Sequence, residues 1–236
     1  MERQWKKAVT FSYDDAVTQD RRLISIFNKY GLKGTFNLNS GFLGTGGSLV
    51  REEVTVAHAK SRPVEIPQIY KGHEVAAHTI HHPMLNTLPD EAVIEEVEGD
   101  RLALSEIVGY EVVGMAYPGS SASATDHVQE LIRQHTGIRY ARNTSSNGRF
   151  SPQENLISFC PTVYHHNNFQ ELFRLGEEFL ALDESTLTEP AVFYIWGHAY
   201  EFDIHDDWDL FEAFCKRISG KPDIFYGTNR ECLLND

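Results

Sequence analysis

The chain has 236 residues, a length that suits one domain, 1–236, built around a single hydrophobic core. Hydrophobic residues make up 41% of it and charged residues 23%, which is the balance of a folded globular protein and excludes a disordered one. The formal net charge of −13 repels phosphate backbones and anionic lipid headgroups, so the composition argues against nucleic acid and membrane partners.

The N-terminal residues lead directly into a strand-like run without the apolar core of a signal peptide, and no later stretch is apolar for long enough to span a bilayer. We therefore expect a cytoplasmic protein. Its three cysteines, Cys160, Cys215 and Cys232, are odd in number and lack metal-type spacing, so they predict buried thiols and no disulfide framework. The sequence leaves the oligomeric state open.

Short β-prone runs alternate with longer amphipathic stretches, the pattern typical of parallel strands joined by crossover helices. We predict an α/β fold, a distorted (β/α) barrel with seven or eight parallel strands, because polar candidates follow many different strands and are not gathered at one switch point. In chain order, strands are expected at 8–13, 34–39, 73–78, 112–117, 138–141, 156–159, 191–196 and 224–226, and helices at 18–30, 51–60, 89–108, 125–135, 169–182 and 208–218.

Two adjacent acids, Asp14 and Asp15, follow the first predicted strand. Neighbouring side chains on an extended segment point apart, so one carboxylate is able to bind a metal while the other moves a proton. A helix cap or a simple turn would also explain such a pair.

Three histidines, His78, His81 and His82, follow the strand at 73–78. Neutral imidazoles are common zinc ligands, and a His pair with one carboxylate leaves positions open for water. His78 and His82 have the spacing of one helical turn, but Pro83 disfavours a helical His82, so we place them on a loop. The spacing alone does not choose between His81 and His82.

Two later strands also end in candidate site residues. The strand at 112–117 leads into Tyr117, Pro118 and Gly119, a tight turn whose backbone N–H groups suit an anion. The strand at 191–196 leads into His198, and in barrel enzymes such strand ends carry catalytic groups.

Together these segments resemble the NodB-homology polysaccharide deacetylases, the carbohydrate esterases that remove N-acetyl groups from glycans. The resemblance extends from Thr10 to about His198. It implies that Asp14 is the general base and that Asp15 is a metal ligand. It further implies that His198, after a late hydrophobic strand, is the general acid.

The family's His-Ser/Thr-x-x-His motif matches residues 78–82, so the resemblance selects His82 over His81 as the ligand that accompanies His78. Its third motif, an aromatic and proline-containing turn, is similar to Tyr117-Pro118-Gly119, which implies that the Gly119 N–H helps to hold the oxyanion.

The sequence departs from the family pattern at two points. Many members carry a base-orienting Arg in the third motif where this chain has Ala116, and Arg139 or Arg142 is the candidate substitute. The family's fourth motif, an Asp and Trp segment, is not evident; the corresponding stretch contains His165 and His166, which are candidates for an auxiliary role.

The implied reaction removes N-acetyl groups from an amino-sugar glycan or oligosaccharide by attack of a metal-bound water. The mixed nitrogen and oxygen ligands suit Zn²⁺ best, with Co²⁺ or Ni²⁺ as alternatives. A hydrolase of a small non-peptide amide, such as a ureide, would fit the same scaffold and is favoured by the missing fourth motif. A catalytically silent carbohydrate-binding domain is favoured by the missing Arg.

Overall fold

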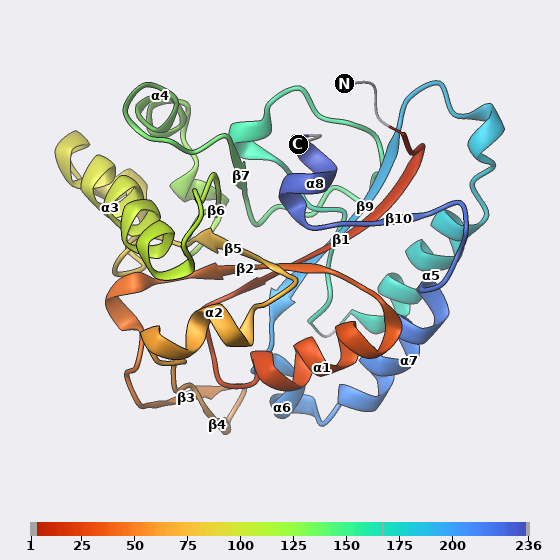
Figure 1. The fold of residues 1–236 in the computed structure, drawn as a ribbon, viewed down its shortest axis with the longest axis horizontal. Coiled ribbons are helices and arrows are strands. Elements are labelled where there is room, and N and C mark those ends of the chain that lie inside the picture. The colour runs from red at the N-terminus through yellow and green to blue at the C-terminus, as the bar shows by residue number, and fades with distance from the viewer. Residues whose placement is uncertain (1–3, 167, 235–236) are drawn as a thin grey trace.

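The computed structural model describes residues 4–166 and 168–234 and is built on an eight-stranded sheet with the order β7-β6-β5-β2-β1-β9-β8, in which β10 also pairs with β1. Every pairing within this sheet is parallel, and the helices are arranged around it (Figure 1). The strands are β1 (Lys7–Asp14), β2 (Gly34–Leu38), β5 (Glu74–Ala77), β6 (Gly114–Ala116), β7 (Tyr140–Arg142), β8 (Val163–Tyr164), β9 (Ala191–His198) and β10 (Phe225–Tyr226).

The longer helices lie close to the predicted positions, and the short helices were not predicted because four or five residues carry no readable periodicity. The helices are α1 (Asp20–Tyr30), α2 (Ile66–Ile69), α3 (Asp90–Val108), α4 (Asp126–His135), α5 (Phe169–Leu180), α6 (Glu201–His205), α7 (Trp208–Ile218) and α8 (Asn229–Leu233). Among the described helices, none combines the length and the apolarity that a bilayer crossing requires.

The curled, incompletely closed sheet confirms the distorted barrel. Its edges are β7 and β8, and the chain between them bridges part of the gap: Phe159 forms a single parallel bridge with Arg142, and the Thr162 N–H donates to the Tyr194 carbonyl at 2.8 Å. The predicted strand at 156–159 is therefore wrong over most of its length. Residues Leu156–Ser158 form a 3₁₀ turn, because the Asn155 side chain accepts a bond from the Ile157 N–H.

The predicted helix at 51–60 is also wrong, because this segment belongs to the hairpin of β3 (Ser48–Arg51) and β4 (Val54–Ala57). Val54, Thr55 and Val56 are β-branched and favour a strand. The turn residues Glu52 and Glu53 have positive φ values of 51° and 66°, as a two-residue hairpin turn requires, although neither is a glycine. Sequence reasoning missed this turn for lack of the usual Asn or Gly.

The core explains why the sheet is a rigid support. All eight residues of β1 are buried, and Phe11 and Phe27 pack with ring centroids 4.7 Å apart between β1 and α1. Each fully buried aromatic or large aliphatic side chain contributes about 1.5–3 kcal/mol to the free energy of folding.

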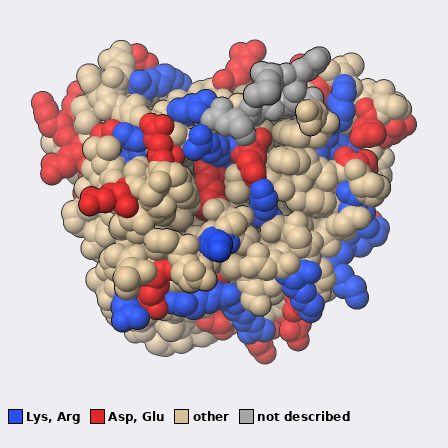
Figure 2. Space-filling model, viewed as in Figure 1, with Lys and Arg blue, Asp and Glu red and all other residues tan. Residues whose placement is uncertain are grey.

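Acidic and basic side chains are mixed on the face seen in Figure 2, so the net negative charge forms no single patch there.

Because the strands are parallel, their carboxyl ends meet at one edge of the sheet, and the register decides which side chains become neighbours. Asp14 is paired with Asn37 of β2 on one side and with His198 of β9 on the other. Farther along the sheet, Ala116 of β6 is paired with Arg142 of β7. Residues far apart in the sequence are thereby brought to one place.

Candidate active site

The two acids at the end of β1, Asp14 and Asp15, point to different partners, as the sequence predicted for neighbouring residues. The chain turns sharply here, since Asp15 and Ala16 have φ values of 85° and 55°. Asp14 is 2% exposed and Asp15 8% exposed, so neither carboxylate is a simple surface charge. Strained backbone at buried acids is typical of functional sites.

Both oxygens of Asp14 are held by the protein. Its Oδ1 accepts a bond from Asn37 Nδ2 at 2.8 Å, and its Oδ2 forms a short bond and ion pair with the buried Arg142 guanidinium. Burial alone would raise the pKa of Asp14, but Arg142, with smaller contributions from His78 and His198, lowers this pKa below its usual value. Asp14 is therefore a fixed carboxylate at neutral pH.

Of the two candidates for the missing guanidinium, Arg142 contacts Asp14, while Arg139 is an exposed residue just before β7. Arg142 is fully buried and its guanidinium lies 4.3 Å from the centre of the Trp196 ring. The register explains the substitution, because Arg142 is the cross-strand partner of Ala116, where the third motif usually has its Arg.

Asp15 is held by residues that sequence reasoning did not identify. Its Oδ2 lies 3.2 Å from His58 Nε2 and 3.8 Å from Lys60 Nζ. Burial would raise the pKa of Asp15, but the bond with His58 and the charge of Lys60 lower it well below its usual value. His58 and Lys60 follow β4, in the segment wrongly predicted as a helix, which is why their approach to Asp15 was missed.

His78 has the tautomer of a metal ligand. Its Nδ1–H donates to the Ala116 carbonyl at 2.8 Å, which leaves the lone pair on Nε2; this atom lies 3.8 Å from Asp14 Oδ2 and 3.9 Å from Asp15 Oδ1. Burial lowers the pKa of His78 to about 4, so the ring is neutral. A neutral imidazole tied at Nδ1 is the form that binds metals.

His82 lies on a loop, as predicted, with a left-handed φ of 56° that Pro83 permits. The Thr79 hydroxyl accepts a bond from the His82 N–H at 3.0 Å, which fixes this turn. His81 points away and its Nδ1 lies 2.8 Å from a Glu96 oxygen, so the geometry separates the two histidines that spacing alone could not.

Asp15, His78 and His82 each offer one ligand atom, and these atoms lie within 4.8 Å of one another. Two imidazoles and one carboxylate are the donor set of many divalent metal sites, which leave the remaining positions for water and substrate. The described structure therefore contains a group that is able to hold a metal, made of the three residues that the sequence predicted.

His198, at the end of β9, lies on the other side of Asp14, with its Nε2 3.9 Å from Asp14 Oδ2. Its Nδ1 lies 3.0 Å from Glu201 Oε1, and its backbone N–H donates to Glu201 Oε2 at 3.0 Å. Burial would lower the pKa of His198, but the Glu201 carboxylate, helped by Asp15 and Asp14, raises it to about 9. His198 is therefore protonated at neutral pH.

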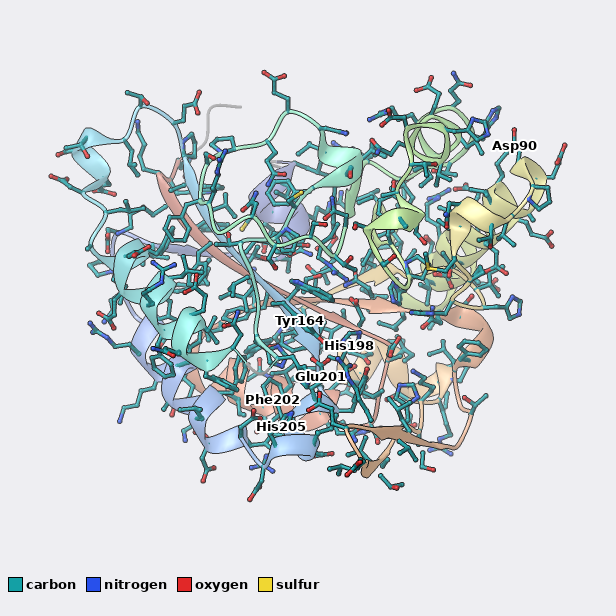
Figure 3. All side chains as sticks on the ribbon, turned by 180° about the vertical axis from the view of Figure 1, so that it is seen from behind. Asp90, Tyr164, His198, Glu201, Phe202 and His205 are labelled. Carbon is teal, nitrogen blue, oxygen red and sulfur yellow. The ribbon has the colours of Figure 1, made fainter. Side chains whose placement is uncertain are left out.

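Glu201 is the principal site residue that sequence reasoning missed. It is 1% exposed and binds Arg51 Nη1 at 2.8 Å, and the Tyr164 hydroxyl donates to it over a short distance (Figure 3). His198, with smaller contributions from His165 and the Tyr164 hydroxyl, holds the pKa of Glu201 well below its usual value, despite the opposing effect of burial. The spacing His198-x-x-Glu201 was the available signal, since residues three apart meet at the start of a helix.

These groups surround a cavity of about 320 Å³, within the size range of small-molecule sites. A second cavity of about 490 Å³ shares His82 and Tyr200 with it and is lined by Asp15, His58 and Lys60. The first cavity is lined by Asp14, Arg51, His78, His82, Tyr117, Gly119, Thr144, Tyr164, Trp196, His198 and Tyr200.

Tyr117 and Gly119 of the predicted turn line this cavity, whereas the candidate auxiliary residues His165 and His166 do not. Tyr117 is buried and its hydroxyl donates to the Ile157 carbonyl at 2.8 Å, which fixes the strand end that carries Gly119. His165 stacks on Phe202 with ring centroids 4.4 Å apart, behind Glu201. His166 instead lies 2.7 Å from Glu52 of the hairpin.

The fold and these residues define a class: a distorted (β/α) barrel with a metal-type triad beside a fixed carboxylate and a protonated histidine. The sequence matches the polysaccharide deacetylase family model over residues 2–141. The chain belongs to the polysaccharide deacetylase family, which confirms the resemblance drawn from the four segments. A search of curated proteins finds no match to this sequence.

Solved structures of this family share the fold. The alignment with a structure assigned as a polysaccharide deacetylase from Mycobacterium smegmatis covers 100% of this chain and 91% of the Mycobacterium chain, at 14% identity and a TM-score of 0.70. The chitin deacetylase of the fungal pathogen Colletotrichum lindemuthianum covers 98% and 88%, at 18% identity and a TM-score of 0.62. A family 4 carbohydrate esterase from Streptomyces lividans, in complex with acetate, covers 89% and 85%, at 14% identity and a TM-score of 0.53.

Proposed function

We propose that this protein is a metal-dependent hydrolase that removes N-acetyl groups from an amino-sugar glycan or oligosaccharide. Its family membership indicates a deacetylase, a hydrolase that acts on carbon–nitrogen bonds. The observation that carries the proposal is the placement of Asp15, His78 and His82, whose ligand atoms lie within 4.8 Å of one another. His78 and His82 line one cavity with Asp14 and His198, and Asp15 lines the adjoining cavity that shares His82.

The donor set fits a borderline divalent ion, and Zn²⁺ is the ion we propose, with Co²⁺ or Ni²⁺ as substitutes. Asp15 and the two histidines would hold it, since His78 is neutral and has its free lone pair on Nε2. When bound, such an ion polarises a carbonyl and lowers the pKa of water.

Asp14 would accept the proton of the attacking water. Its carboxylate is fixed by Arg142 and Asn37, so little reorganisation is needed when the proton moves. Its lowered pKa makes it a weak base, which is sufficient only for a water molecule that is already acidified.

His198 would donate a proton to the leaving amine, because an amine anion is too poor a leaving group to depart alone. Its pKa of about 9 keeps the required proton in place at neutral pH, and Glu201 orients the ring so that Nε2 faces the cavity. The Gly119 N–H would hold the oxyanion, a contact worth about 3 kcal/mol where one donor is removed.

The decisive test is an acetate-release assay on N-acetylchitooligosaccharides of increasing length, with zinc-loaded and chelator-treated protein. A panel of linear and cyclic ureides is assayed in parallel. Zinc-dependent release of acetate supports the proposal, whereas turnover of the ureides alone would identify a small-amide hydrolase. Stoichiometric zinc without any hydrolysis would identify a silent carbohydrate-binding domain.

A further inference from the structure

We propose a second divalent metal site, made of Glu52, His166 and His205, that fixes one wall of the catalytic cavity. The three residues come from the turn of the β3–β4 hairpin, the loop after β8 and the end of α6. Their ligand atoms all lie within 4.8 Å of one another, and none of the three belongs to the metal-type triad of Asp15, His78 and His82. The inference therefore does not depend on the proposed function.

His166 and His205 both contact the Glu52 carboxylate through their Nε2 atoms. His166 Nε2 lies 2.7 Å from Glu52 Oε1, and His205 Nε2 lies 3.2 Å from Glu52 Oε2. In a tetrahedral zinc site with bonds of about 2 Å, neighbouring ligand atoms are separated by about 3.3 Å. Small rotations of the exposed Glu52 side chain would complete such a site.

A second observation supports a metal over a plain surface ion pair. His166 is 7% exposed, and its other ring nitrogen, Nδ1, faces the buried Glu201 at 3.8 Å. Histidines that bind metals commonly present the second nitrogen to a carboxylate, which fixes the ring and raises its basicity. An exposed ion pair with Glu52 would not require this buried partner.

The site would link three elements that form the wall of the cavity. Arg51 precedes Glu52 in the hairpin and reaches Glu201 at 2.8 Å and the Tyr200 hydroxyl at 3.1 Å. His205 lies one helical turn after Glu201 on α6, on the side away from His198 (Figure 3). A metal here would hold the hairpin against α6 and keep Arg51 in the wall of the cavity that it lines.

The test is the zinc content of the untagged full chain after dialysis against a buffer with low micromolar free Zn²⁺. We expect two ions per chain in the wild type and one in His205→Ala and in Glu52→Gln. His78→Ala should also retain one ion, from the second site. The matched control is His127→Ala, since His127 pairs with Asp90 at 2.8 Å on the surface and should leave two ions.

A second measurement separates the sites by stability, because a ligand that binds only the native state raises the melting temperature. Zinc should raise the melting temperature of His78→Ala and leave that of His78→Ala/His205→Ala unchanged. One ion per chain in both the wild type and His205→Ala would overturn the second site. Loss of an ion in His127→Ala would also overturn it, as a sign of unspecific surface binding. A failure of the catalytic site would instead appear as an unchanged zinc content in His78→Ala.

Discussion

Replacing Glu201 by Gln tests whether the buried carboxylate keeps His198 in its acid form. The amide retains the size and much of the hydrogen bonding of Glu201 but removes the negative charge 3.0 Å from His198 Nδ1. Burial would then dominate, and the pKa of His198 should fall from about 9 to its ordinary value of 6.5 or below. At 1.36 kcal/mol per pKa unit, this change corresponds to about 3 kcal/mol.

The magnitude can be read from the protonated fraction of His198. At pH 8, about nine tenths of the wild-type side chains carry the proton when the pKa is about 9, against about one in thirty when it is 6.5. Amide hydrolysis by Glu201→Gln should therefore fall about 30-fold at pH 8 and change little at pH 5.5, since both proteins are then mostly protonated.

The assay is a pH profile of acetate release from an acetamide substrate, repeated with an aryl acetate whose leaving group departs without a proton. The alkaline limb of the amide profile should move to lower pH in Glu201→Gln, and the aryl acetate profile should not move. A bound dication lowers the pKa of His198 in both proteins, so the difference between their profiles is the readout. An alkaline limb at the same pH in both proteins would refute this role of Glu201.

Three further predictions concern other parts of the site. Asp15→Asn should lose bound zinc, whereas Asp14→Asn should retain zinc and lose about 100-fold or more in turnover. Elemental analysis measures the zinc and the acetate assay measures the turnover of each variant. Zinc loss in Asp14→Asn with zinc retained in Asp15→Asn would contradict the roles assigned to the two acids. Arg142→Leu should lower the free energy of unfolding at pH 7 by about 3–5 kcal/mol, because it leaves a buried charge on Asp14. Urea denaturation of Arg139→Leu, at an exposed position, should show a smaller change. The stability from the Asp14 pair is present above the unfolded pKa of about 3.9 and is lost as the pH falls through its lowered folded value, so the two variants should converge in acid. Gly119→Ala should lower turnover while zinc remains bound, because the φ of 75° disfavours alanine and an added Cβ would lie 2.3 Å from a methionine sulfur, so that the turn and its N–H must shift; unchanged turnover would contradict this dependence on the geometry of the turn.

The sequence was sufficient where chemistry follows a strong local pattern. Asp14, Asp15, His78 and His198 each follow a β-prone run, and the parallel fold brings such strand ends together. The long amphipathic helices were also readable, because α1 carries its apolar residues at helical spacing and ends at Gly31 in the left-handed conformation.

The sequence was insufficient where a contact depends on register or on a short turn. Arg142 was one of two candidates, and only the pairing of β6 with β7 shows which of them reaches Asp14. Arg51 and His58 act on the site from a hairpin that was predicted as a helix, since its turn lacks glycine. Glu201 is only three residues from His198 in the sequence, but its burial and its hydrogen bonds with Arg51 and Tyr164 are tertiary properties.

The pairing of Ala116 with Arg142 has a consequence for how relatives of this protein are recognised. The family model matches this chain over residues 2–141, but a short linear motif that requires the Arg of the third motif on its own strand would reject it. Neighbouring parallel strands present their side chains to the same space, so a guanidinium can arrive from either strand while the carboxylate it serves stays where it is. A pattern that tests position 116 or its cross-strand partner, and requires an Arg at one of them, would retain chains that the linear motif discards.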